Sequence, residues 1–293
     1  MRRKLTWRDA AFHGFNYAIM LLLCFAILYP VLYVLSRSVM TEAEKAVRAF
    51  ALIPNTIDFS AYKVILAPTS QVMGAYGTTL LRTVIGTALN LLTSTLFAYA
   101  ISKRKYPLSR VLTFMMTFTM WFGGGLIPSY LLMRSLGLIN SFWVYIVPGL
   151  MSAWNTLIMR NFFYGIPESL EESAEIDGAN DLQTLFRIIL PLSKASLATI
   201  GLFYAVGHWN AWFDAMLYMN DSRRWTLQFV LRQIVNAASA KDILQYTTSM
   251  DAPPPTQAVR MAAIVVATLP ILFVYPFVQK YFVKGVLVGS IKG

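Results

Sequence analysis

An acidic stretch interrupts an otherwise apolar chain, and its residue types suit binding to a soluble partner. Small and acidic side chains surround a glycine, and a short apolar group ending in proline follows; the set is Glu172, Ser173, Ala174, Asp177, Gly178, Ala179, Ile188, Leu190 and Pro191. Carboxylates interact favourably with the positive end of a helix dipole, and glycine readily adopts the positive φ that ends a helix. The pattern predicts two short helices joined by a turn.

The flanking residues set the expected limits of these two helices. Pro167 can begin the first helix, and Gly178 can end it. A second helix is expected from about Asp181 to Ile189, and Pro191 then marks the bend into the next apolar segment. An ordinary solvated loop with capping carboxylates is the alternative interpretation of the same residues.

A second group of chemically active side chains lies inside the apolar segments themselves. It comprises aromatic, amide and acidic residues, namely Trp121, Asn155, Trp209, Asn210, Trp212 and Asp214. Polar groups are costly inside a membrane and usually face a cavity or a partner. Aromatic faces stack on sugar rings, and amides and carboxylates hydrogen-bond hydroxyl groups, so the group suits a carbohydrate path. Helix packing with interfacial tryptophans is the alternative.

Several kinds of chemistry have no counterpart in the sequence. There is no G-x-x-x-x-G-K-[ST] phosphate loop, so the chain is not expected to hydrolyse ATP by that route. His13, His208 and Cys24 do not form a metal-ligand pattern, and no catalytic cluster can be argued. The chain is therefore expected to be no enzyme, with no metal and no bound cofactor. The three glycines at positions 123–125 lack a following lysine and indicate a helix interruption instead.

Composition identifies the membrane as the solvent of this chain. It is 57% hydrophobic and 13% charged, with a mean hydropathy of +0.54, against about 25% charged in soluble domains. A spanning helix needs about 20 mostly apolar residues. The segments that qualify are Phe15–Val39, Thr78–Ser102, Ser109–Met133, Ser141–Phe163, Ala195–Met219 and Ala258–Val283. We therefore predict an all-α, polytopic membrane protein with about six transmembrane helices and a cytoplasmic coupling helix.

Basic residues set the expected orientation in the membrane. They concentrate in the N-terminal arm, in the loop after the second segment (Lys103, Arg104, Lys105 and Arg110) and in the tail. These regions fall on one side of a six-helix protein, which the positive-inside rule makes the cytoplasm. Both termini are then cytoplasmic. The net charge of +11 is explained by topology rather than by binding to nucleic acid.

The predicted organisation is a cytoplasmic arm at residues 1–14 followed by a six-helix domain at residues 15–293. That domain carries the acidic stretch in a coupling loop at residues 165–193 and a nearly neutral outer loop at residues 220–257. Pro253, Pro254 and Pro255 stiffen the end of the outer loop.

The pattern E-S-A-x-x-D-G-A followed by I-x-L-P resembles the EAA coupling motif of permease subunits in ATP-binding-cassette importers. The likeness extends over nearly the whole chain and is strongest to the smaller permease of maltose and oligosaccharide importers. The ending Tyr281–Gly285 and the pair Trp209-Asn210 also resemble that branch. Ser173 departs from the usual alanine, and Ala195 stands where many members have a second proline.

The resemblance implies several partners. They are a second, related permease, two ATPase subunits that bind ATP and Mg, an extracytoplasmic solute-binding protein, membrane lipid and an oligosaccharide. It also implies a bacterial cytoplasmic (inner) membrane as the location. Glu172 and Asp177 would contact the ATPase, Gly178 would form the turn, and Ala174 and Ala179 would allow close packing. Ile188, Leu190 and Pro191 would seat the second helix, and the outer loop would reach the binding protein or act as a rigid connector.

The substrate is expected to be an acidic oligosaccharide, since the chain also resembles the second permease of the bacterial alginate importer. Arg82, Arg134 and Arg260 could guide a uronate chain, or could extend to lipid headgroups. A neutral oligosaccharide is the alternative. An ion-coupled secondary transporter is a further one, for which Asp214 is the candidate intramembrane acid.

Overall fold

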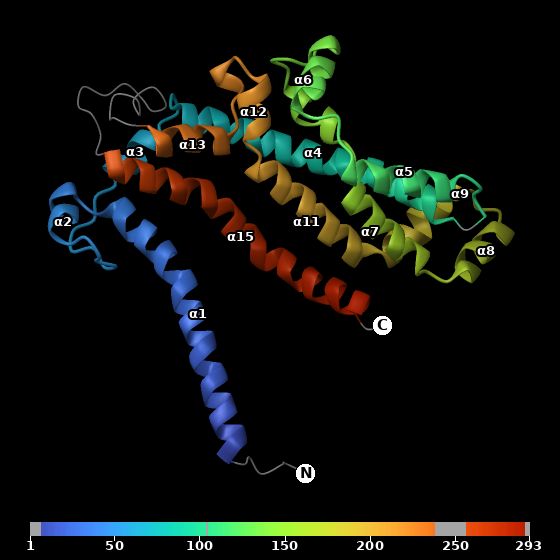
Figure 1. The fold of residues 1–293 in the computed structure, drawn as a ribbon, viewed down its shortest axis with the longest axis horizontal. Coiled ribbons are helices and arrows are strands. Elements are labelled where there is room, and N and C mark those ends of the chain that lie inside the picture. The colour runs from blue at the N-terminus through green and yellow to red at the C-terminus, as the bar shows by residue number, and fades with distance from the viewer. Residues whose placement is uncertain (1–6, 104, 238–255, 291–293) are drawn as a thin grey trace. The chain divides into compact units, whose positions relative to one another are not determined.

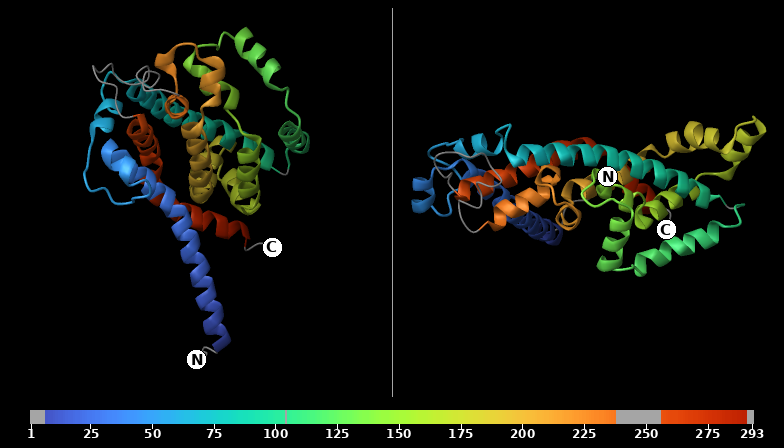
Figure 2. Two further views of the ribbon diagram at one scale, coloured as in Figure 1. Left: turned by 60° about the vertical axis from the view of Figure 1, so that its left-hand side comes forward. Right: turned by 90° about the horizontal axis from the view of Figure 1, so that it is seen from above.

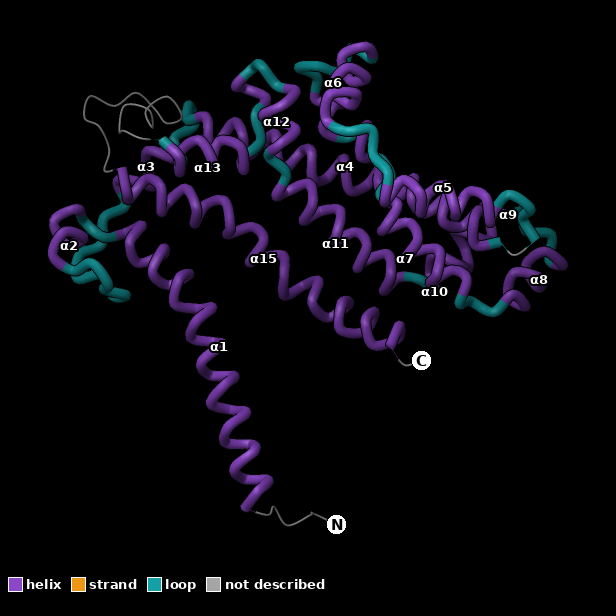
Figure 3. Tube along the Cα trace, in the orientation of Figure 1, coloured by secondary structure: helices purple, strands orange, loops and turns teal. Residues whose placement is uncertain are grey.

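The computed structural model describes residues 7–103, 105–237 and 256–290 of the chain. Every regular element in these ranges is helical, as Figure 3 shows, which confirms the predicted all-α class. Three helices are long and apolar enough to cross a membrane: α1 (Trp7–Val39), α4 (Gln71–Ser102) and the part of α15 (Thr256–Ser290) at Gln257–Val274. Three pairs of shorter helices pass the same test when each bent pair is taken as one span, which gives up to 6 spans.

The bent pairs divide segments that the sequence presents as continuous. α5 (Ser109–Trp121) and α6 (Leu126–Ser135) meet at 115°, and the break lies at the three glycines, where Gly125 has a φ of 82°. This confirms the predicted helix interruption. The fourth predicted segment begins as two 3₁₀ turns, which meet α7 (Ala153–Tyr164) at 49°. The third bent pair joins Asp181–Leu192 to α11 (Lys194–Asn210) at 87°, so this candidate span begins before the predicted fifth segment. The predicted segment Ala195–Met219 is itself divided between α11 and α12 (Phe213–Tyr218).

Shorter elements connect these helices. They are α2 (Glu42–Val47), α3 (Ser60–Ile65), η1 (Phe142–Tyr145), η2 (Val147–Gly149), α8 (Glu168–Ile176), α9 (Asp181–Thr184), the π-helical turn η3 (Leu185–Ile189), α10 (Leu190–Leu192), η4 (Ser222–Arg224) and α13 (Leu227–Asn236). Part of the predicted outer loop is thus helical as η4 and α13, whereas its residues 238–255 lie outside the described residues.

The chain divides into two compact units. Unit 1 contains residues 1–70 and 233–268, and unit 2 contains residues 71–232 and 269–293. In unit 1, the candidate span in α1 has none of its side chains buried, as expected of a surface made for lipid or a partner. At the end of α1 the buried Arg37 donates to the Lys45 carbonyl (3.2 Å) and to Gln257 Oε1 (3.5 Å).

Glu44 organises the connection between α2 and α3 within unit 1. Its carboxylate accepts hydrogen bonds from the backbone N–H groups of Asn55 (2.8 Å) and Thr56 (3.2 Å) and from Arg48 (2.9 Å). The backbone N–H of Asn55 contributes most to holding the pKa of Glu44 below its usual value. This loop is therefore folded rather than extended.

Unit 2 is built on α4, which packs against α11 and α7 (Figure 1). One apolar cluster joins these helices to η3, and its members are Ala98, Tyr99, Met159, Phe163, Leu185, Ile189, Ile200 and Tyr204. A second cluster joins α6, η1, α12 and α13, with Met133, Val144, Tyr145, Ile146, Ala215, Met219 and Phe229. The two clusters fix the helices that carry both groups of predicted functional residues.

Close packing of α4 and α11 depends on a glycine. A Cβ atom added at Gly86 would lie 2.4 Å from the Nε2 atom of His208, a distance that side chains do not tolerate. Gly77 lies nine residues earlier in α4, and a Cβ atom added there would have no neighbouring atom within 4 Å. The approach of His208 to the α4 backbone therefore requires glycine at position 86 and not at position 77.

We expect Gly86→Ala to destabilise the protein by about 1–3 kcal/mol, the usual cost of an overpacked core. Gly77→Ala is the matched control, because alanine is favoured over glycine in a helix and meets nothing there. Thermal unfolding of the two variants in the same detergent measures the difference. Equal melting temperatures would contradict the packing of His208 against α4.

Candidate functional site

The acidic stretch folds as the two-helix element that the sequence predicts. α8 follows Pro167 and carries Glu168 and Glu171 in its first turn. It ends in a Schellman motif, in which Ala179 N donates to Ala174 O (2.9 Å) and Gly178 N donates to Glu175 O (3.0 Å). Gly178 has a φ of 81°, so the turn needs the glycine, and Ala174 is buried beneath it.

The second half of the element is fixed at its start and anchored in its middle. Asn180 and Gln183 form a reciprocal capping box that begins α9. The π-helical turn η3 follows, and its Leu185 and Ile189 are fully buried among α4, α7 and α11. The resemblance implies that Ile188, Leu190 and Pro191 seat the second helix, but Ile188 and Leu190 are only half-buried and Pro191 is exposed. The i, i+4 spacing of Leu185 and Ile189 is the signal that could have identified the anchors.

Two lysines tie the end of α4 to this element. Lys103 Nζ forms an ion pair with Glu171 and lies 3.5 Å from Asp181, so it bridges α8 and α9. Lys105 Nζ lies 3.5 Å from Glu172 and 3.8 Å from Glu168. Both lysines were interpreted from sequence as topology-setting charges, and the structure gives them these further contacts.

The two lysines differ in how firmly they are held. The Lys103 side chain is 25% exposed and its ammonium group lies 4.4 Å from the centre of the Tyr99 ring. Burial opposes its charged form, but the hydrogen bonds with Glu171 and Tyr99 raise the pKa of Lys103 above its usual value. Lys105 is 77% exposed, where ion pairs contribute little. Lys103 is therefore the structural link, and Lys105 is a surface contact.

The outward side of the element remains open to a partner. Ile176 is 86% exposed, and Leu182 and Phe186 are also exposed although they are apolar. Asp177 is exposed beside Ile176, and Ser173 donates its hydroxyl to the Ser169 carbonyl (2.8 Å). A cavity of about 800 Å³ separates α8 and α9 from the end of α4, with Tyr106, Glu172 and Asp181 in its wall. Figures 1 and 2 place this element at the end of α4 from which the chain continues into α5.

The predicted path residues are only partly brought together. Asn210, Trp212 and Asp214 line one cavity of about 370 Å³ at the break between α11 and α12. Trp209 is buried and packs edge-on against Tyr76. Asn155 is buried near the start of α7, and its backbone N–H is capped by Ser152.

Trp121 is exposed at the end of α5 and does not line this cavity. The path remains a prediction for all six residues, of which Asn210, Trp212 and Asp214 share a cavity.

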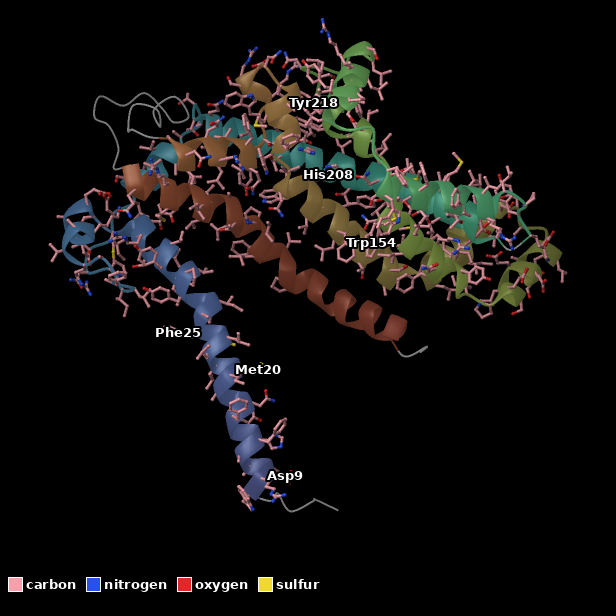
Figure 4. All side chains as sticks on the ribbon, in the orientation of Figure 1. Asp9, Met20, Phe25, Trp154, His208 and Tyr218 are labelled. Atoms are coloured by element: carbon pink, nitrogen blue, oxygen red, sulfur yellow. The ribbon has the colours of Figure 1, made fainter. Side chains whose placement is uncertain are left out.

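A buried polar network lies next to this cavity, and the sequence does not predict its contacts. Arg82 of α4 pairs with Asp214 of α12 through its two terminal guanidinium nitrogens. Nη1 donates to Oδ1 at 3.1 Å, and Nη2 donates to Oδ2. Arg82 Nε donates to His208 Nδ1 (3.3 Å), so the other ring nitrogen carries the proton and donates to Asn90 Oδ1 (2.6 Å). His208 is labelled in Figure 4.

The structure bears on two expectations from the sequence: that three arginines reach a uronate chain or lipid headgroups, and that Asp214 is a free intramembrane acid. Arg82 is 4% exposed and paired, so it does not extend to lipid headgroups. Arg134 is exposed in α6. Arg260 donates to the Ala237 carbonyl within unit 1. Because Asp214 is held in an ion pair, it is a poor candidate for the free acid that an ion-coupled transporter requires.

The chain is similar in sequence to known transport proteins. Residues 90–288 match the family model described as the inner membrane component of binding-protein-dependent transport systems. The chain is 45% identical to the polygalacturonan/rhamnogalacturonan transport system permease protein YtcP of Bacillus subtilis, over 98% of this chain and 100% of that protein. It is 46% identical to protein LplC of the same organism, over 90% of this chain and 89% of that protein.

One solved structure is similar to this chain over nearly its whole length. It is the crystal structure of a bacterial ABC transporter involved in the import of the acidic polysaccharide alginate. One of its chains is 34% identical to this protein, with a TM-score of 0.87, and the match covers 96% of this chain and 99% of that chain.

We expect Lys103→Met to loosen α8 and α9, because it leaves the part-buried Glu171 without its cation. Hydrogen exchange of the backbone amides at residues 168–184 should then become faster. Lys105→Met is the matched control, since it also removes two ion pairs, but from an exposed site. Equal exchange in the two variants would contradict the distinction between the lysines.

Proposed function

The chain belongs to the family of inner membrane components of binding-protein-dependent transport systems, and from this premise we propose that it is a permease subunit of an ATP-binding-cassette importer for acidic oligosaccharides. The substrate would be a uronate-rich chain, related to polygalacturonan or alginate, that is moved into the cytoplasm. ATP and Mg would bind to separate ATPase subunits. The chain itself would form part of the translocation path and would transmit the motion.

The two-helix element of α8, α9 and η3 (residues 168–189), here called the docking element, carries this proposal. It has the exposed apolar side chains Ile176, Leu182 and Phe186, while Leu185 and Ile189 anchor it in the helix packing of unit 2. An element that is exposed and apolar outside and rigidly anchored inside is suited to receiving force from a partner. The ATPase is the partner that the coupling motif implies, with Glu172, Asp177 and Ile176 at the contact.

Two kinds of relative support the acidic substrate. The name of YtcP refers to polygalacturonan, and the solved importer carries alginate. Both are polymers of uronic acids, although their sugars differ. Within this chain, the cavity at the α11–α12 break offers an amide, an indole and a carboxylate, with a buried arginine behind that carboxylate. These groups fit the hydroxyls, ring faces and carboxylates of such a polymer.

The same premise supports the remaining partners and the location. A second, related permease would complete the path, and two ATPase subunits would complete the importer. An extracytoplasmic binding protein would deliver the sugar. The multi-pass chain would lie in the bacterial inner membrane with both termini in the cytoplasm, since the basic residues concentrate on that side.

We expect Ile176→Asp to detach the ATPase while the permease stays folded, because the side chain is 86% exposed and packs on little of this chain. Loss of an apolar contact at the centre of an interface costs about 2–4 kcal/mol, or roughly 30- to 1,000-fold in affinity. Co-purification of the ATPase with the permease pair measures the loss.

Val47→Asp serves as the control, because Val47 is 85% exposed at the end of α2 and makes the same apolar-to-acidic change on an element of the other unit. Retention of the ATPase by the Ile176 variant, or an equal loss in the Val47 variant, would contradict the proposed docking surface.

The substrate class is tested by ATP hydrolysis in proteoliposomes that contain the permease pair and the ATPase. The binding protein is added with a galacturonate or mannuronate oligosaccharide, or with a neutral oligosaccharide of equal length. We expect stimulation by the uronate-loaded form and little by the neutral one. Stimulation by the neutral form alone would replace the acidic substrate with a neutral one, and hydrolysis independent of the binding protein would contradict the importer.

A further inference from the structure

Arg82 is held in place by neutral groups as well as by its carboxylate partner. Its Nε donates to His208 Nδ1 (3.3 Å), and its Nη2 donates to the Tyr145 carbonyl (3.5 Å). The guanidinium carbon also lies 4.6 Å from the centre of the Tyr145 ring. These contacts orient the guanidinium group without neutralising its charge. The cation therefore has a fixed position whether or not a carboxylate is bound to it.

Asp214 supplies the negative charge from a different kind of position. It lies in α12, a helix of 6 residues that starts directly after the break at the end of α11. Its side chain is 23% exposed, whereas that of Arg82 is 4% exposed. Among the described residues, no other carboxylate forms an ion pair with Arg82. The anion of this pair is thus on a short, separate element and the cation is on the long helix α4.

The exposed side of Asp214 faces the cavity of about 370 Å³ that Asn210 and Trp212 also line. The Trp212 ring is covered by the guanidinium group of Arg232 at 3.9 Å, which keeps the indole ordered at this place. A sugar acid in this cavity would meet an amide, an indole and the Asp214 carboxylate. It would reach Arg82 only by taking the place of Asp214.

We propose that Arg82 is a carboxylate receptor in the translocation path and that Asp214 occupies it as an exchangeable internal carboxylate. This inference rests on the proposed function and names the residues that take the uronate group. A carboxylate entering the cavity would be repelled by Asp214 and attracted by Arg82. Displacement of α12 exchanges one anion for the other and leaves the cation paired throughout. The Asp214 carboxylate and a uronate carboxylate can each form the same bidentate contact with the guanidinium group.

The exchange requires that the receptor accept a free carboxylate when Asp214 is removed. In Asp214→Ala, Arg82 is buried without an anion, and the complex should melt at a lower temperature than the unchanged complex. We expect sodium acetate and sodium galacturonate to restore most of that loss in a saturable manner. Galactose and sodium chloride at equal concentrations should not. The measurement uses the full permease–ATPase complex in lipid nanodiscs, without ATP.

Two further variants separate a receptor from a general anion effect. Arg82→Met combined with Asp214→Ala lacks the cation and should not respond to carboxylates. Asp221→Ala removes a carboxylate of similar exposure, 21% against 23% for Asp214, whose partners Arg223 and Arg224 are exposed, and it should not respond either. Asp214→Ser, whose shorter side chain also leaves the position beside Arg82 free, replaces the alanine variant if that complex does not assemble.

No carboxylate-dependent stabilisation in the Asp214 variants would overturn the proposal, as would an equal response in the variant without Arg82. The readout is independent of transport. If the uronate-loaded binding protein fails to stimulate hydrolysis but acetate still stabilises Asp214→Ala, the proposed substrate is wrong and the receptor stands. If stimulation occurs without carboxylate rescue, the importer stands and the receptor is wrong.

Discussion

A guanidinium group buried among membrane helices must be surrounded by acceptors, and much of unit 2 is arranged to meet that requirement. The cost of an unpaired charge in such a place is several kcal/mol. Arg82 therefore draws together His208 from α11, Asp214 from α12 and the Tyr145 carbonyl from η1. The glycine at position 86 makes the approach of His208 possible. Asp214 lies in the second position of α12, directly after the break that ends α11, and pairs with the arginine from there.

The helix α4 connects this network to the docking element. It runs from Gln71 to Ser102 without a break, and Lys103 follows directly with its contacts to α8 and α9. Leu185 and Ile189 also pack against α4, α7 and α11. The two-helix element and Arg82 therefore contact or belong to the same unbroken helix. Rigid helices joined by packed side chains are the physical means by which distant sites can influence each other.

Local features of the chain were readable because they depend on nearby residues. The positive φ of Gly178, the start of α8 after Pro167 and the interruption at the three glycines each follow from one residue type and its neighbours. Segment length predicted about six spans, whereas the described residues contain three unbroken candidate spans and reach 6 only when each bent pair is taken as one span. The angles of the bends, 115°, 49° and 87°, were not predicted, because mean hydropathy carries no information about the direction of the chain.

The sequence by itself determined that the chain is an all-helical membrane protein with an acidic two-helix element, since composition, spacing and turn chemistry are local properties. Only the tertiary structure decided which charges meet. Arg82 and Asp214 are 132 positions apart, and Lys103 and Glu171 are 68 apart. Nothing in the spacing of such residues fixes their pairing. Tertiary packing makes that choice, because a buried charge is stable only where the folded helices bring its partner to it.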